Sequence, residues 1–163
     1  MKIEERWTYA APADRVIAMM VDPAFQEAKC AATNALSHKV VITAKKPLQI
    51  IETHREMATT GLPDQVTKII GSKLKIVETQ IWGEADTAGS RIADLDVSLV
   101  GVPVTYRGTI TMTADGDQTH MHVLGELKAR VMFIGGRIEN AAAPAFTSGV
   151  KIEAETGHTF LQK

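Results

Sequence analysis

The chain has 163 residues, 45% of them hydrophobic and 23% charged, a composition that suits one globular domain spanning residues 1–163. A formal net charge of −1 excludes general attraction to nucleic acid or to an anionic membrane. The single cysteine, Cys30, excludes an internal disulfide and fits a reducing compartment. The N-terminus is charged and no apolar run is long enough to span a membrane, so we expect a cytoplasmic protein without a signal peptide.

The first third of the chain predicts one strand and two short helices. Apolar and polar residues alternate over residues 2–10, which indicates a strand that ends at Pro12. Residues 13–21 carry apolar side chains at helical spacing. Residues 23–33 predict a second short helix, with Asp22 in position to cap it.

From residue 36 onward the hydrophobic pattern changes to a period of two, which predicts six more strands joined by short turns. The Asp115-Gly116-Asp117 sequence is a strong tight-turn signal between the last two strands. Residues 58–72 interrupt the strand pattern with a short amphipathic segment. We interpret this segment as a lid, with an apolar face formed by Val66, Ile69 and Ile70.

The last predicted strand runs through Gly135-Gly136 into a helix of about 25 residues, roughly 37 Å long at helical rise. Steps of four and three residues place five side chains on one face of this helix: Ile138, Ala142, Ala145, Gly149 and Ile152. Small residues in the middle of that face have two interpretations. They leave a cavity between helix and sheet, or they let the helix approach the sheet closely with no void.

The predicted strands have one apolar and one polar face, and the final helix is the only long element able to cover the apolar face. Tyr106, Ile110 and Met112 share the apolar face of one strand, and Met121 and Val123 share that of the next. The expected fold class is α+β: a curved seven-stranded antiparallel sheet wrapped around a long C-terminal helix, with two short helices after the first strand.

Five stretches carry a resemblance to a known superfamily: WTYAAPADRVIAMMVDPAF, DPAFQEAKC, ETQIW, GTITMTADGDQT and GELKARVMFIGGRIE. Together they resemble the START-like superfamily, also called the helix-grip, SRPBCC or Bet v-like fold, and within it an uncharacterised actinobacterial family. The resemblance implies one START-like domain with a tendency to bind ligands. The chain departs from the pattern at Met132-Phe133, where a proline is expected, and at Pro144 inside the final helix.

The leading functional hypothesis is binding or carriage of a small hydrophobic or amphipathic, lipid-like ligand between the sheet and the C-terminal helix. The predicted ligand contacts are Tyr106, Ile110, Met112, Met121, Val123, Ala142, Ala145, Gly149 and Ile152. One alternative is a cyclase- or hydratase-like enzyme that uses the same pocket. Another is a protein-interaction module without a ligand.

No residues in the sequence indicate catalysis, a metal or a cofactor. His120 and His122 share one strand face without a third ligand nearby, and His54 lies among carboxylates on a predicted outer face. Cys30 has no neighbouring histidine in the sequence to activate its thiol. The pattern also reveals no buried acid–base pair, which favours a binding protein over an enzyme.

Overall fold

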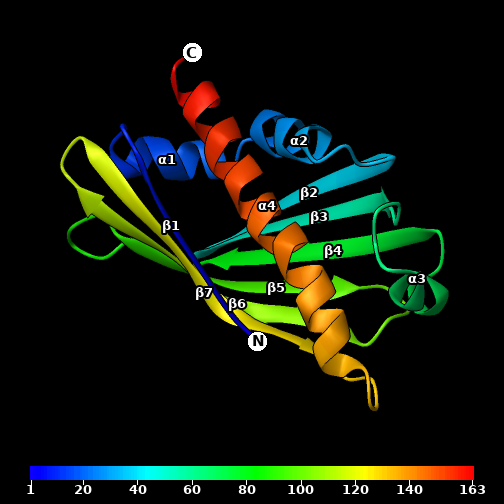
Figure 1. The fold of residues 1–163 in the computed structure, drawn as a ribbon. Helices are drawn as coiled ribbons and strands as arrows, with labels where there is room; N and C mark the ends of the chain where they lie inside the picture. Colours follow the sequence, from blue (N-terminus) through cyan, green and yellow to red (C-terminus); the bar gives the residue numbers. More distant parts are fainter.

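The computed structural model describes residues 1–163 and contains four helices and seven strands (Figure 1). In chain order these are β1 (Lys2–Tyr9), α1 (Ala13–Met20), α2 (Pro23–Ala32), β2 (Ser37–Lys45), β3 (Leu48–Ala58), α3 (Asp64–Ile70), β4 (Lys73–Trp82), β5 (Arg91–Leu99), β6 (Val104–Asp115), β7 (Gln118–Ala129) and α4 (Gly135–Leu161).

The strands form one antiparallel sheet in the order β1-β7-β6-β5-β4-β3-β2. The curved sheet wraps around α4, with α1 and α2 beside the C-terminal half of that helix and α3 near its N-terminal half (Figure 1). The predicted α+β helix-grip fold is therefore confirmed. No helix, α4 included, has the length and apolar character needed to cross a membrane.

Local sequence explains where the helices begin and continue. Asp22 caps α2 because its carboxylate accepts a hydrogen bond of 2.8 Å from the backbone N–H of Ala24, and Pro23 occupies the first turn. The C-terminal helix begins at Gly135, the first glycine of the predicted strand-to-helix connection, and continues through Pro144. The proline lies on the exposed side of α4.

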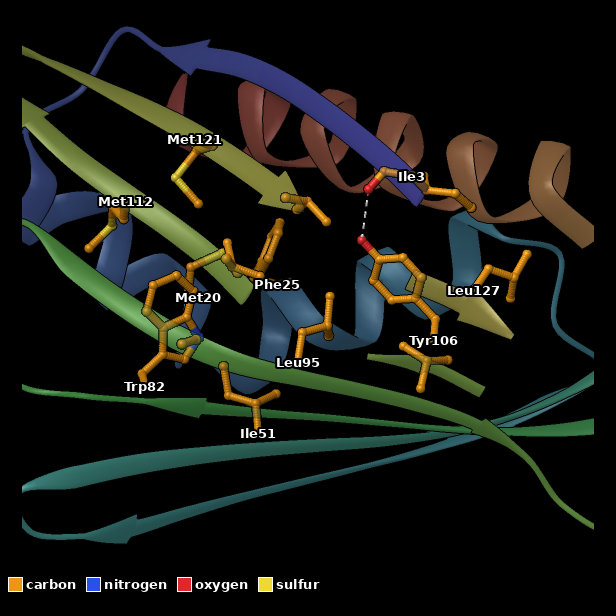
Figure 2. Close-up of a cluster of buried hydrophobic side chains, with 14 of the residues drawn as sticks. Ile3, Met20, Phe25, Ile51, Trp82, Leu95, Tyr106, Met112, Met121 and Leu127 are labelled. Atoms are coloured by element: carbon orange, nitrogen blue, oxygen red, sulfur yellow. Dashed lines mark hydrogen bonds between the residues drawn. The ribbon is translucent and has the colours of Figure 1, made fainter. Parts of the chain in front are cut away.

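One part of the interior is a closely packed core of large side chains. Met20, Phe25, Trp82, Met112 and Met121 are all buried, and they come from α1, α2, β4, β6 and β7 respectively. Figure 2 shows Met112 and Met121 in this part of the cluster, apart from Tyr106 and Ile3. The short helices α1 and α2 thus close one end of the space that the sheet encloses.

Gly125 makes room for an aromatic ring on the inner face of the sheet. Gly108 on β6 pairs with Gly125 on β7. A β-carbon at Gly125 would lie 2.7 Å from Cζ of Tyr106, so only glycine lets the ring lie over this strand. The Tyr106 hydroxyl donates a hydrogen bond of 3.3 Å to the carbonyl of Ile3 (Figure 2).

Candidate ligand cavity

A cavity of about 310 Å³ lies between the inner face of the sheet and α4. Of the 29 residues that line it, 21 are hydrophobic, so apolar surface dominates its wall. A space of this size and character is typical of sites for small organic molecules.

Most of the sequence-predicted contact residues meet at this cavity. Its wall includes Tyr106, Ile110 and Val123 from the sheet and Ala142, Ala145, Gly149 and Ile152 from α4. Met112 and Met121 do not line it, although they share the apolar faces of β6 and β7. Both methionines lie instead in the packed core around Trp82 and Phe25, because α1 and α2 fill the space over that end of the sheet.

The small residues of α4 leave open space at one turn and allow close approach to the sheet at another, as two of its glycines show. A β-carbon at Gly149 would meet no heavy atom within 4 Å, so this turn borders open space. At Gly157 a β-carbon would fall 2.6 Å from Tyr9 ring atoms, so that turn lies tightly against β1. Ala145 lies at the rim, since it lines the cavity and is itself exposed.

Tyr106 contributes a ring rather than an ionisable group to the cavity. Its ring lies 5.1 Å from that of Phe146 on α4, measured between centroids. Burial raises the pKa of the Tyr106 hydroxyl to about 12, so the phenol stays neutral at physiological pH. This aromatic pair connects β6 to α4 across the cavity.

The segment predicted as a lid contains α3 and borders the cavity. Val66 is buried and Ile70 half-buried, and both line the wall, whereas Ile69 is exposed and lies outside it. The one side-chain hydrogen bond between this helix and α4 runs from Arg137 Nη1 to Gln65 Oε1 and is long, at 3.4 Å. The segment thus covers part of the cavity with weak polar anchorage to α4.

A buried ionic cluster forms the polar part of the wall. Lys29 on α2 donates hydrogen bonds of 2.8 Å to Glu78 Oε1 and 3.0 Å to Glu153 Oε2. Arg55 on β3 donates from Nη2 to Glu78 Oε2 at 3.0 Å. All four residues line the cavity, and their side chains are only 3–12% exposed. The cluster joins α2, β3, β4 and α4 around one apolar space.

Mutual attraction keeps Lys29 and Glu78 charged in spite of burial. Burial alone would raise the pKa of Glu78, but Lys29 and Arg55 lower it to about 2. Burial alone would lower the pKa of Lys29, but Glu153 and Glu78 outweigh that effect and raise it. Gln80 also donates a hydrogen bond of 2.9 Å to Glu78 Oε1, which helps to fix that carboxylate.

The sequence pattern revealed no buried acid–base pair, but the structure contains this buried ionic cluster. The signal was present on single strands: Glu78 and Gln80 share the inward face of β4 with Trp82, and Arg55 shares that of β3 with Ile51. Lys29 follows Phe25 by one helical turn, and Glu153 follows Gly149 by one turn. The sequence pattern does not show that α2, β3, β4 and α4 bring these four residues together.

The histidines lie outside the cavity. His120 approaches Asp115 at 3.0 Å, His122 approaches Glu4 at 2.9 Å, and His54 approaches Glu52 at 2.6 Å. No group of three or more His, Cys, Asp or Glu side chains is arranged as metal ligands would be. Cys30 is buried, and burial raises the pKa of its thiol, which disfavours the reactive thiolate.

Solved structures with the same architecture establish the fold of this protein. A protein from Thermus thermophilus matches with a TM-score of 0.63 at 13% identity, over 98% of this chain and 95% of that one. A STAR-related lipid transfer protein from Xanthomonas axonopodis matches with a TM-score of 0.59 at 12% identity, over 99% and 86%. The Zhui aromatase/cyclase from Streptomyces matches with a TM-score of 0.55 at 13% identity, over 98% and 89%. At these identities the likeness establishes the START-like, helix-grip fold.

The particular family follows from the sequence match. Residues 4–161 match the family described as "Protein of unknown function (DUF2505)", and the chain belongs to that family. The match covers nearly the whole chain, in agreement with the predicted membership of an uncharacterised family. A comparison with curated proteins finds no match.

Proposed function

We propose that this protein binds and carries a small apolar or amphipathic molecule in the cavity between its sheet and α4. The observation that carries the proposal is the predominantly hydrophobic wall of a 310 Å³ space that the surrounding side chains leave open. The similar fold of a lipid transfer protein supports the same class of function. The buried, unpaired Cys30 fits a reducing compartment, and we propose a cytoplasmic location.

An enzyme that uses the same pocket is the second candidate, because the wall contains a buried lysine and carboxylates and because the fold is also that of an aromatase/cyclase. General acid–base catalysis works best with groups whose pKa values lie near the working pH. The raised pKa of Lys29 and the pKa of about 2 for Glu78 hold both groups in their charged forms at neutral pH. This favours carriage over proton transfer.

Native mass spectrometry of the protein purified from its own host tests the proposal. We expect a noncovalent adduct of one small molecule, released intact when the protein is denatured. Incubating the protein with the released molecule then separates the two candidates, because a carrier returns it unchanged and an enzyme converts it. Absence of any adduct, together with no binding of the apolar dye Nile red, would contradict the proposed function.

A further inference from the structure

The ionic cluster makes the cavity wall chemically asymmetric. Of the residues that line the cavity, Lys29 is on α2 and Glu153 is in the C-terminal half of α4, whereas Val66 is on α3 and Ile138 is near the start of α4. Figure 1 shows α2 beside the C-terminal half of α4 and α3 near its N-terminal half. An amphipathic molecule would therefore meet charged groups at one end of the cavity and apolar side chains at the other.

The polar groups of the cluster are not all paired with one another. Lys29 has three N–H donors and makes two hydrogen bonds, to Glu78 and Glu153. The Arg55 guanidinium donates to Glu78 through Nη2, so Nη1 keeps its donating capacity. The hydrogen bonds of Glu153 involve Oε2 and its backbone, so Oε1 keeps its accepting capacity. Most buried polar groups in proteins are hydrogen-bonded, so unpaired groups beside a cavity point to an interaction that a ligand completes.

The charge balance decides which kind of polar group fits. Lys29 and Arg55 supply two positive charges, and Glu78 and Glu153 supply two negative ones. A carboxylate or phosphate would add an unbalanced negative charge in a space of low dielectric, which is strongly unfavourable. An uncharged oxygen can accept from the donors without disturbing the balance, and a hydroxyl can also donate to Glu153.

We infer that the cavity selects amphipathic ligands whose polar group is an uncharged hydroxyl, ketone or ester oxygen held at the ionic cluster, with the apolar tail directed toward α3. This inference rests on the proposed carrier function and names the ligand class. It makes Arg55 a specificity-determining residue, since its guanidinium supplies donors at that end of the cavity.

Displacement of Nile red by three molecules of equal chain length tests the selection: decane, decanol and decanoate at neutral pH. We expect decanol to displace the dye at a concentration up to about tenfold lower than the concentration of decane that is needed. This difference corresponds to the net contribution of one hydrogen bond between the decanol hydroxyl and the cluster. Decanoate should be the weakest of the three. Equal displacement by decane and decanol, or strongest displacement by decanoate, would overturn the selection while leaving the carrier function standing.

Two variants of Arg55 test whether the ionic cluster causes the preference for decanol over decane. Arg55→Met should remove the advantage of decanol over decane without weakening decane, and Arg55→Lys should keep part of it. Arg107→Met is the matched control, because Arg107 is 64% exposed and pairs with Asp96 outside the cavity. An equal loss for decane and decanol in Arg55→Met would contradict the assignment. If the wild-type protein neither binds Nile red nor carries an adduct from its host, the proposed function itself fails.

Discussion

Gly157 of α4 lies against the ring of Tyr9 so closely that no other residue fits between helix and strand. A β-carbon at position 157 would fall 2.6 Å from the Cε1 and Cζ atoms of Tyr9. The Tyr9 hydroxyl also donates to the carbonyl of Glu153 at 3.4 Å, one turn earlier on α4. The C-terminal half of α4 is thereby fixed to β1, while the turn around Gly149 stays clear of the sheet.

Alanine at these two glycines should change stability in opposite directions. Gly157→Ala forces a methyl group into Tyr9, and overpacking of this kind typically destabilises by about 1–3 kcal/mol. Gly149→Ala adds a methyl group to open space and replaces a poor helix former, so it should stabilise by about 0.5–1 kcal/mol. Urea unfolding of both variants measures the difference. Equal effects at the two positions would show that α4 does not lie as described.

Acid should destabilise the protein through Glu78. Its pKa falls from 4.5 to about 2 on folding, so its ionised form contributes stability above pH 4.5 that is lost as the pH falls toward 2. Glu78→Gln should flatten the pH dependence of the melting temperature in that window. At neutral pH it should destabilise by up to about 3–5 kcal/mol, because it breaks a buried ion pair.

Glu4 provides the control for that experiment. Hydrogen bonds from Lys2, Arg6 and His122 lower the pKa of Glu4 to about 2 as well, but this carboxylate is exposed. Salt at about 0.5 M screens exposed pairs far more than buried ones. The acid sensitivity due to Glu78 should therefore persist in salt. A pH dependence that salt abolishes, or that Glu78→Gln leaves unchanged, would count against the buried cluster.

The α3 segment should open far more readily than the sheet beside it. Glycines with positive φ lie at both ends, Gly61 at 90° and Gly71 at 83°, and the Arg137–Gln65 contact to α4 is long. Hydrogen exchange should be much faster in residues 64–70 than in β6, and it should slow when Nile red is bound. Protection equal to that of the central strands in the free protein would contradict a lid at this position.

The fold could be predicted from the sequence because its signals are local. The two-residue alternation indicated which face of each strand is buried, and the face of α4 from Ile138 to Ile152 could be read from helical spacing. These patterns fixed the layers: a sheet with one apolar face and a helix that covers it. The resemblance to START-like proteins independently implied the same order of elements.

The division between core and cavity could not be predicted, because it depends on where other elements pack. Met112 and Ile110 share one face of β6, yet Met112 lies in the packed core and Ile110 lines the cavity. The ionic cluster is non-local in the same way. Lys29 and Glu153 are 124 residues apart in sequence, and only the packing of α2 against α4 brings them together.

The space beside Gly149 should accept an apolar molecule. Gly149 and Gly136 both lie in α4, and a β-carbon at either would meet no heavy atom within 4 Å, but only Gly149 lines the cavity. The decisive measurement is binding of Nile red to Gly149→Trp and to the matched control Gly136→Trp. Gly149→Trp should stay folded and lose dye binding, while Gly136→Trp should bind the dye as the wild type does. Undiminished binding by a folded Gly149→Trp protein, or no binding by the wild type, would contradict this expectation.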